Sequence, residues 1–313
     1  MKMKKSDQDK LQDQLRVVGD ADGRNIIGNL NSLNLGFSGV DNEYGPHTLL
    51  KLSYLNYYLG VFLTIANRWK KKGRFNKIVF VDAFAGSGLV GIKDSGSTVL
   101  GSTLLAAGDK RVDQVISIKK DGSKANILEK RCVALGYNNV AIEIGDTNQL
   151  IPLLPSRFNI GPKSIVMLFL DPEGMEPEFS QFVPLSKATD SVDIILNYTW
   201  GVYRLAGRIE KGIYPGDLER MKKLIPNYIA GDNPDEKLLE YFEKQFGKPI
   251  GRKIDIHSDG SKIVYSMILR VRQTTSGSPW VSAMDEFGNF VSSIDGDRAL
   301  KALNVVKGVQ TTL

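Results

Sequence analysis

An acidic residue stands shortly before two glycines in the segment Val81-Asp82-Ala83-Phe84-Ala85-Gly86-Ser87-Gly88. Glycines let the backbone approach a ligand closely. A carboxylate at the end of a buried strand can bind the amino group of a cofactor that carries an amino acid. We therefore predict a nucleoside-cofactor site here, with Asp82, Phe84, Gly86 and Gly88 as cofactor-binding residues. The alternative is a plain glycine-rich turn, because two glycines at this spacing often arise by chance.

A second acid follows a later predicted strand, in Gly145-Asp146, with Asn148 two residues further on. A carboxylate in this place can accept a hydrogen bond from an adenine exocyclic amine, and Asn148 can assist it. Alone, an aspartate after a strand is more often the N-cap of the next helix. We therefore predict Asp146 and Asn148 as cofactor-binding residues only in combination with the glycine segment.

A third acid, Asp171, follows the apolar run Ile165–Leu170 and begins Asp171-Pro172-Glu173-Gly174. A carboxylate at the rim of so apolar a strand is partly desolvated unless a donor satisfies it. Functional sites hold carboxylates in such surroundings, so Asp171 and Glu173 are the predicted catalytic residues. The alternative interpretation is a structural turn formed by Asp171-Pro172.

The elements around these acids must bring them together. Short apolar runs alternate with amphipathic stretches, which predicts right-handed crossovers and a doubly wound parallel sheet. Ligands bind at the carboxyl ends of the strands in such a sheet, and all three acids lie at strand ends. The predicted strands are Ile78–Phe84, Val115–Ile118, Val140–Ile144, Ser164–Leu170 and Val192–Asn197, and the predicted helices are Ser102–Gly108, Ala125–Leu135 and Asn148–Leu154.

Additional elements flank this sheet at both ends of the chain. Residues 1–45 are polar, and we predict a loosely ordered arm with one short helix near Gln8–Val18. A strongly periodic helix runs from Pro46 to about Lys71 and is expected to pack on the core. Its three tyrosines, Tyr54, Tyr57 and Tyr58, occupy other faces and are predicted to be packing and interface residues rather than a cofactor site.

The pattern changes beyond Tyr198. We predict helices, a strand with an antiparallel partner that closes the sheet, and a C-terminal helix from Arg298. The helices are Arg204–Ile213, Leu218–Ile225 and Asp235–Phe246, the strand is Lys262–Arg272 and its partner Trp280–Met284. The predicted organisation is thus an arm (1–45), one doubly wound domain (46–290) with a helical insertion (204–250), and a tail (291–313).

Composition limits the kinds of site. Cys132 is the only cysteine, so no intramolecular disulfide and no cysteine-based metal cluster can form, and with only two histidines we predict no metal site. No apolar run approaches the length of a membrane span, and we predict a cytoplasmic protein without membrane contact. The net charge of +6 permits a nucleic-acid partner. The basic cluster from Arg68 to Arg74 is either a solvated helix end or a phosphate-backbone contact.

In this order the motifs resemble those of class I methyltransferases, and residues from Thr48 to about Arg204 resemble the three-Cys-motif partner (TcmP) family. The resemblance covers about half of the chain. It implies a Rossmann-like sheet with helices on both faces and extra helical elements at both ends, S-adenosyl-L-methionine as cofactor, and a three-Cys-motif protein as partner. The segments that carry it are Thr48-Leu49-Leu50-Lys51-Leu52, Val81–Gly88, Gly101-Ser102, Gly145-Asp146-Thr147-Asn148, Leu170-Asp171-Pro172-Glu173-Gly174 and Leu196-Asn197-Tyr198, with Arg204 beyond.

One position departs from the family pattern. Class I methyltransferases usually have an acid at the end of the second strand, where it binds both ribose hydroxyls, but this chain has Lys119-Lys120-Asp121. Losing such charge-assisted hydrogen bonds costs about 1.5–3 kcal/mol each. Three outcomes stay open: Asp121 replaces the acid as a cofactor-binding residue, the cofactor binds weakly or the site is degenerate, or a more phosphorylated nucleotide binds there.

Three functions are therefore weighed. The first is an S-adenosylmethionine-dependent methyltransferase acting on nucleic acid, in which Asp171 accepts a hydrogen bond from a base amine and Tyr198 or Trp200 supplies a stacking face. The second is a catalytically quiet Rossmann-like subunit that regulates a three-Cys-motif protein. The third is another nucleotide-using enzyme, such as a nucleotidyl transferase or hydrolase. The sequence lacks the P-loop signature and the clustered metal carboxylates that would favour it.

Overall fold

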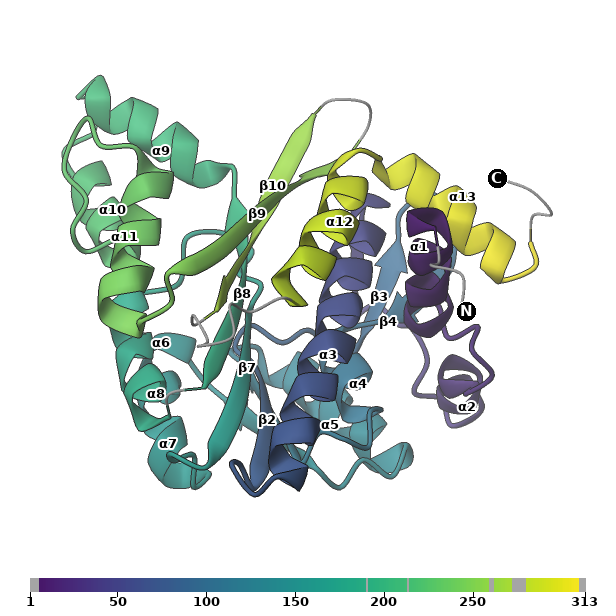
Figure 1. Ribbon diagram of the computed structural model, residues 1–313. Coiled ribbons are helices and arrows are strands. Elements are labelled where there is room, and N and C mark those ends of the chain that lie inside the picture. Colours follow the sequence, from purple (N-terminus) through teal and green to yellow (C-terminus); the bar gives the residue numbers. More distant parts are fainter. Residues whose placement is uncertain (1–5, 190, 213, 259–261, 272–279, 310–313) are drawn as a thin grey trace.

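The computed structural model describes residues 6–189, 191–212, 214–258, 262–271 and 280–309. Residues 1–5, 213, 272 and 310–313, which belong to the predicted arm, one predicted helix, one predicted strand and the predicted tail, lie outside this range. A seven-stranded sheet forms the centre (Figure 1), in the order β6-β5-β2-β7-β8-β10-β9. Its strands are β2 (Lys77–Asp82), β5 (Gln114–Lys119), β6 (Val140–Ile144), β7 (Ser164–Leu170), β8 (Val192–Thr199), β9 (Ile250–His257) and β10 (Ile263–Val271).

The pairing confirms the predicted doubly wound, Rossmann-like sheet. The five strands from β6 to β8 are parallel neighbours. Strand β10 runs antiparallel to β8, and β9 runs antiparallel to β10. The chain leaves β2 toward β5 on one side, whereas β7 leads to β8 on the other. The carboxyl ends of β2 and β7 therefore mark the switch point where ligands bind in folds of this kind.

The antiparallel edge differs from the prediction in one element. The partner of β10 is β9, and the predicted strand at Trp280–Met284 is wrong, because these residues begin helix α12 (Trp280–Ser292). The buried residues Val281, Met284, Phe287 and Val291 recur at helical spacing along α12. A short apolar run can be mistaken for a strand when only its first turn is considered.

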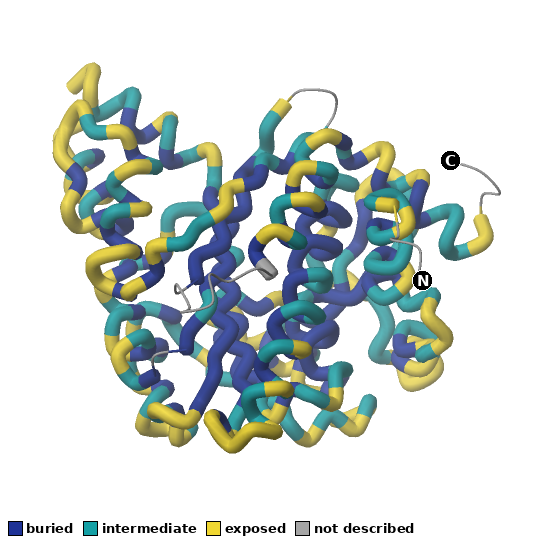
Figure 2. Tube along the Cα trace, viewed as in Figure 1, coloured by how far each residue is buried: buried dark blue, intermediate teal, exposed yellow. Residues whose placement is uncertain are grey.

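Helices cover both faces of the sheet, and alternate strand residues point to opposite faces. Phe80, Phe169 and Ile195 pack with α1, α3, α12 and α13, whereas Val81, Leu168 and Ile194 pack with the helices of the other face. Figure 2 shows this buried interior running through the centre of the molecule. The first face carries α1 (Asp7–Val18), α2 (Ile26–Ser32), α3 (His47–Lys71), α4 (Ser102–Ala107), α5 (Gly122–Ala134), α12 and α13 (Gly296–Val306).

The second face carries the shorter helices between β6 and β9. They are α6 (Thr147–Leu150), the 3₁₀ helix η1 (Ile151–Leu153), α7 (Leu154–Arg157), the 3₁₀ helix η2 (Phe179–Phe182), α8 (Val183–Ala188), α9 (Gly201–Glu210), α10 (Asp217–Leu224) and α11 (Pro234–Phe246). The last three form a lobe at the left of Figure 1, beyond the edge of the parallel strands.

Helix α3 is the longest element and crosses the middle of the first face. Tyr54 and Tyr58 are fully buried on it, as expected of packing residues. Among the described helices, α3 alone is long and apolar enough to cross a bilayer, but 67% of its most apolar stretch is buried inside the protein. Burial of this kind is typical of a core helix.

The loose order predicted for the first 45 residues is wrong for the described part of that segment. Leu11, Leu15 and Val18 of α1 are fully buried against the core, so the polar composition hides an amphipathic helix. A small sheet that was not predicted follows, formed by β1 (Asn42–Tyr44), β3 (Leu89–Ile92) and β4 (Ser97–Leu100). It ties the N-terminal segment to the residues just after the glycine segment.

Candidate active site

Two cavities lie side by side at the carboxyl ends of the parallel strands. The smaller, of about 290 Å³, is bounded by the glycine segment and the ends of β5 and β6. The larger, of about 1110 Å³, lies over the ends of β7 and β8 and reaches α9. Six residues line both cavities and form the wall between them: Asn42, Tyr44, Thr48, Lys51, Asp171 and Glu173.

The glycine segment forms one side of the smaller cavity, as predicted for a close approach of backbone to ligand. Phe84, Gly86 and Gly88 all line it. A Cβ at Gly86 would meet nothing within 4 Å, so the space above this backbone is open. Gly88 has φ +99°, and a Cβ there would come within 2.9 Å of Leu128. The chain can make this turn against α5 only with glycine.

Asp82 lies one layer below the cavity wall. It is fully buried, and its Oδ2 accepts hydrogen bonds from Ser102 (2.6 Å) and Thr103 (2.8 Å), both of which line the smaller cavity. Its Oδ1 is buried without a hydrogen-bond partner among the described residues. Burial raises the pKa of Asp82 to about 6, although the two hydroxyls lower it. As a cofactor-binding residue Asp82 stays a prediction, one that requires Ser102 and Thr103 to mediate the amino-group contact or the unpaired oxygen to make it.

Because the pKa of Asp82 is raised, replacing its carboxylate by a neutral amide should increase the free energy of unfolding at neutral pH. Asp82→Asn keeps the shape and removes a buried charge, and a pKa shift from 3.8 to about 6 corresponds to roughly 2–3 kcal/mol at pH 7. Relative to the variant, the wild type loses this amount of stability as pH rises from about 4 to about 6. In this range its folded state still holds the proton of Asp82, whereas its unfolded state has released it. Urea unfolding at pH 4 and pH 7 should show a more stable variant at pH 7 alone; a less stable variant there would contradict the assignment.

Asp146 and Asn148 both line the smaller cavity, and each also has a structural role. Asp146 caps α6 by accepting from the Asn148 backbone N–H (2.9 Å), so the N-cap interpretation describes its geometry as well. The Asn148 side chain donates to the carbonyl of Glu176 and accepts from the backbone N–H of Glu178. It thereby fixes the loop after β7 over the cavity.

Lys119 and Lys120 also line the smaller cavity, where the resemblance placed an acid. Asp121 does not line it. Its Oδ1 accepts from the backbone N–H groups of Ser123 (2.9 Å) and Lys124 (3.2 Å), which caps α5. As a cofactor-binding residue Asp121 stays a prediction, one that requires its side chain to leave this cap.

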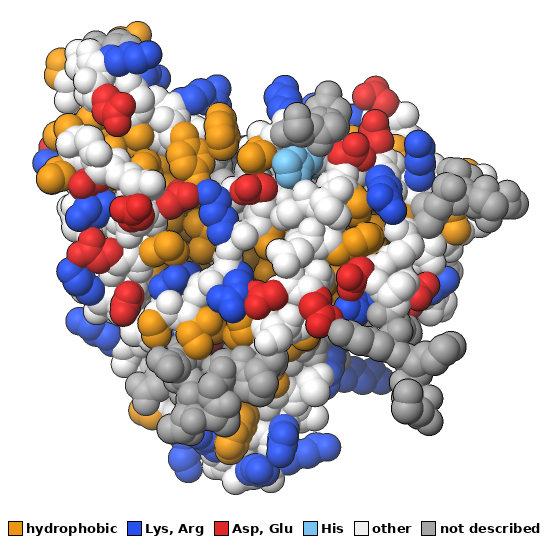
Figure 3. Space-filling model, turned by 45° about the horizontal axis from the view of Figure 1, so that its top comes forward, with side chains coloured by type: hydrophobic (Ala, Val, Ile, Leu, Met, Phe, Trp, Pro, Cys, Tyr) orange, Lys and Arg blue, Asp and Glu red, His pale blue; other side chains and the backbone are white. Residues whose placement is uncertain are grey.

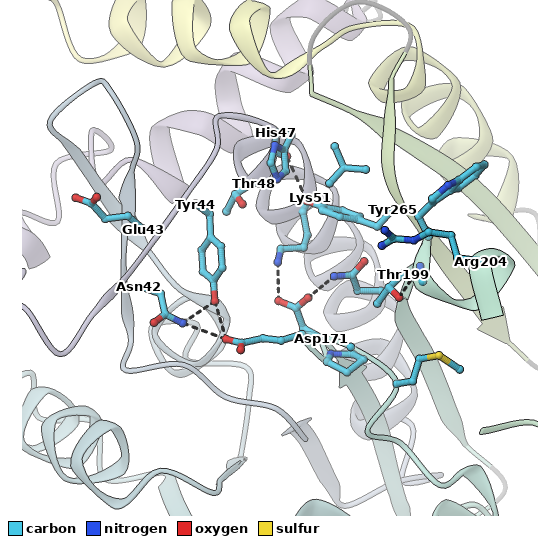
Figure 4. A pocket seen from close by; sticks show the side chains of 18 of the residues that line it. Asn42, Glu43, Tyr44, His47, Thr48, Lys51, Asp171, Thr199, Arg204 and Tyr265 are labelled. Atoms are coloured by element: carbon cyan, nitrogen blue, oxygen red, sulfur yellow. Dashed lines mark hydrogen bonds and ion pairs between the residues drawn. The ribbon is translucent and has the colours of Figure 1, made fainter. Parts of the chain in front are cut away.

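Asp171 stands in the wall between the cavities and is held from two sides (Figure 4). Its Oδ2 pairs with Lys51 Nζ at 2.7 Å, and its Oδ1 accepts from Asn197 Nδ2 at 2.6 Å. The Asp171 side chain is still 23% exposed, whereas that of Lys51 is only 9% exposed. Tyr44 and Tyr265 place their rings within 6 Å of the ammonium, which stabilises a cation in a nearly dry site.

Glu173, the second predicted catalytic residue, closes the same wall on the side of the N-terminal segment. Its Oε1 accepts from Tyr44 Oη (3.1 Å) and Asn42 Nδ2 (3.2 Å). These contacts join the loop after β7 to β1, across the boundary of both cavities. Glu173 therefore orders the wall, and its carboxylate keeps acceptor capacity toward either cavity.

Sequence reasoning missed Asn42, Tyr44, His47 and Lys51 as site residues. One signal was visible, because Lys51 is a lysine within the apolar run Leu49-Leu50-Lys51-Leu52, and a lysine on a buried helix face needs an anionic partner. His47 lines the larger cavity, and burial, with Lys51 and Lys93 nearby, lowers its pKa to about 4. It is neutral at physiological pH.

The far wall of the larger cavity is built from α9 and α10 and carries Trp200, Arg204, Arg208 and Arg220. Of the two predicted stacking residues, Trp200 is 44% exposed and lines the cavity, whereas Tyr198 is 2% exposed and does not. The prediction for Tyr198 is wrong, because alternation along β8 turns its ring into the core beneath Tyr203.

Neither a protein-family model nor a curated protein matches this sequence. The solved structures that it resembles include several methyltransferases. TYW2 of M. jannaschii in complex with AdoMet is 14% identical, with a TM-score of 0.37 over 65% of this chain and 73% of that one. An O-methyltransferase from Bacillus cereus in complex with SAH is 14% identical, with a TM-score of 0.40 over 87% and 93%. TomG of Streptomyces achromogenes, in complex with SAM, is 13% identical, with a TM-score of 0.38 over 87% and 92%.

Proposed function

We propose that this chain transfers a methyl group from S-adenosyl-L-methionine to a nucleophile bound in the larger cavity. The observation that carries the proposal is the pair of cavities that meet at Asp171 and Lys51, at the switch point of a doubly wound sheet. When two reactants are bound in adjoining cavities, the protein accelerates their reaction mainly by orienting them toward each other. The cofactor, when bound, supplies an electrophilic methyl group on a sulfonium.

The residues of the smaller cavity fit such a cofactor. The unpaired Oδ1 of Asp82 and the hydroxyls that Asp82 polarises suit an ammonium group. The open backbone at Gly86 suits close contact with the rest of the molecule. Asp146 Oδ2 is not used by the N-cap bond, and beside Lys120 Nζ at 3.6 Å it keeps acceptor capacity for an adenine amine. A volume of about 290 Å³ suits a ligand of nucleoside size.

The finer proposal is that the methyl acceptor is an exocyclic amine of a nucleic-acid base. The Asp171 carboxylate, which Asn197 Nδ2 holds in place, is partly exposed at the ends of β7 and β8, and a base amine donates to such a group. Trp200 offers an exposed indole for stacking in the same cavity. Asp171 then orients the amine lone pair toward the smaller cavity.

The direct test is calorimetric titration of the purified chain with S-adenosylmethionine and S-adenosylhomocysteine. Saturable binding of both ligands, weakened by Gly86→Val, is expected because a side chain at Gly86 enters the open space of the smaller cavity. Absence of binding at millimolar ligand would refute the proposal.

Lys119→Glu should tighten binding of S-adenosylhomocysteine. A carboxylate at the end of β5 would accept ribose hydroxyl hydrogen bonds that a lysine cannot, each worth about 1.5–3 kcal/mol, so we expect a tenfold or larger decrease in Kd. Lys130→Glu, which makes the same charge change on the exposed face of α5, is the matched control. Equal effects of both changes would show that only net charge matters.

The second candidate function is a catalytically quiet subunit of a three-Cys-motif protein, and Lys119 at the cavity favours it. It predicts that cells complemented with Asp82→Ala or Asp171→Ala behave like cells with the wild type. Loss of complementation by either variant, at normal protein level, supports the enzyme instead.

A further inference from the structure

The wall of the larger cavity opposite Asn42 and Glu43 is cationic. Arg204, Arg208 and Arg220 all line it. Arg208 is fixed by Asp217 through two hydrogen bonds, of 2.9 and 3.0 Å. Arg204 and Arg220 are exposed, and neither guanidinium has an acidic partner among the residues that the structure describes. Two unneutralised guanidinium groups in a concave wall make a site for an anion.

The arginines continue a stripe along one side of α9. Trp200 caps the helix, and Arg204 and Arg208 follow it at intervals of four residues, which places all three on one face. Each step rises about 6 Å along the helix axis, comparable to the separation of phosphates in an extended strand. Arg220 reaches the same cavity from α10.

The two sides of the larger cavity carry opposite charges. Glu173 is bound to Tyr44 and Asn42. In Figure 4, Asn42, Glu43 and Tyr44 lie on the side of β1, and Arg204 lies on the opposite side, beyond Asp171 and Thr199. Hydrophobic side chains gather beside the lobe of α9–α11 on the face shown in Figure 3. An anionic group would therefore bind at α9, with an attached aromatic group directed past Trp200 toward Asp171.

We infer that α9 and α10 form a phosphate-binding wall, in which Arg204 and Arg220 hold the phosphate esters of a nucleotide-bearing substrate whose base stacks on Trp200. This inference rests on the proposed function, because it places the base at the site of methyl transfer. Arginine binds phosphate oxygens through paired N–H groups, and base stacking on an aromatic residue beside cations is typical of single-strand recognition.

The predicted basic cluster Arg68–Arg74 does not compete with this wall. Lys70 pairs with Asp113, and Lys72 and Arg74 lie over the ring of Trp69. The cluster comprises the last turn of α3 and the residues that precede β2, so it lies at the amino edge of the strands, away from both cavities. These contacts favour the helix-end interpretation.

The test compares Arg204→Gln/Arg220→Gln with Lys211→Gln, which removes a charge just beyond α9 outside both cavities. The probes are a fluorescein-labelled mixed-sequence 12-nucleotide single strand, as RNA and as DNA, measured by anisotropy, and nucleoside 5′-monophosphates, measured by calorimetric titration. We expect the double variant to bind at least tenfold more weakly, and the slope of log K against log salt to fall by about 1.4 for two lost contacts on a single strand. Lys211→Gln should resemble the wild type.

The probes distinguish the source of the phosphate. Binding of the strand indicates nucleic acid, and binding of monophosphates alone indicates a free nucleotide. Weaker binding of either probe to the double variant supports the wall. Unchanged affinity and slope in the double variant, or arginine-dependent binding of a poly-glutamate peptide in place of both probes, would overturn it. Titration of the same variants with S-adenosylhomocysteine separates the two proposals. Wild-type cofactor affinity without arginine-dependent binding of the strand or of the monophosphates rejects only the wall. Arginine-dependent binding of either probe without cofactor affinity rejects only the methyltransferase.

Discussion

Asp171→Asn is expected to reduce methyl transfer by about 10²–10³-fold, within the range of a positioned acid–base group, while binding of neutral S-adenosylhomocysteine changes little. The amide keeps the shape of the side chain but loses the charge that pairs with Lys51 and orients an amine donor. The readout is tritium transfer from labelled S-adenosylmethionine to total RNA or DNA of cells that lack this protein. Thermal unfolding of the variant reports whether the unpaired Lys51 disturbs the fold.

Glu173→Gln provides the matched control for this prediction. The Glu173 carboxylate accepts two hydrogen bonds through Oε1, and a glutamine oxygen accepts both as well. Turnover of Glu173→Gln should therefore stay within about tenfold of the wild type, the range of one neutral hydrogen bond. If Asp171→Asn retained full turnover, Asp171 would have only a structural role and another group would orient the acceptor.

Asp41→Asn is expected to lower the free energy of unfolding by about 3–5 kcal/mol, the cost of breaking a buried ion pair. The Asp41 and Arg131 side chains are fully shielded from solvent, and their N–O distances are 2.5 and 2.8 Å. Arg131 also donates to the carbonyls of Leu35, Gly36 and Ser87, so all five N–H groups are satisfied. The substitution leaves a buried guanidinium without its anion.

Guanidinium chloride unfolding checks this value, and Asp109→Asn serves as control. Asp109 pairs with Arg111 at a half-exposed site (28% and 37% exposed), where the loss should be below about 1 kcal/mol. Although burial opposes ionisation, Arg131 and Ser87 hold the pKa of Asp41 below its usual value. The stabilisation is therefore present above pH 4 and is lost as pH falls through the lowered pKa. Similar losses in both variants would contradict a special role for the buried pair.

The ends of β2 and β7 could be predicted from sequence because Asp82 and Asp171 each follow an uninterrupted apolar run, whereas Glu143 interrupts the run before Asp146. Parallel strands buried on both faces make such runs, and crossover connections bring their carboxyl ends to one edge. Asp146 and Asp171 accordingly line one cavity with Gly86 and Gly88. Of these three acids, Asp82 is the one that lies below the cavity wall, because its burial below Ser102 depends on side-chain packing.

The wall between the cavities could not be predicted in the same way. Lys51 and Asp171 are 120 residues apart, and Tyr44 and Glu173 are 129 apart. Local periodicity carries no information about which distant segments meet. Strand β9 was missed for another reason: it is an edge strand in which Arg252, Lys253 and Asp255 interrupt the apolar pattern, as is usual where an edge must resist pairing with other chains.

The burial of α3 has a consequence for synthesis on the ribosome. This helix emerges before every strand of the central sheet, yet its apolar side is covered by residues as late as Phe287 and Leu303. A chain grows by about 5–20 residues per second, so the side of α3 that α12 and α13 cover stays exposed for more than about ten seconds. During that interval it has the length and hydropathy of a membrane span, and nascent chains of this protein are expected to need a chaperone that shields α3 until α12 and α13 have been made.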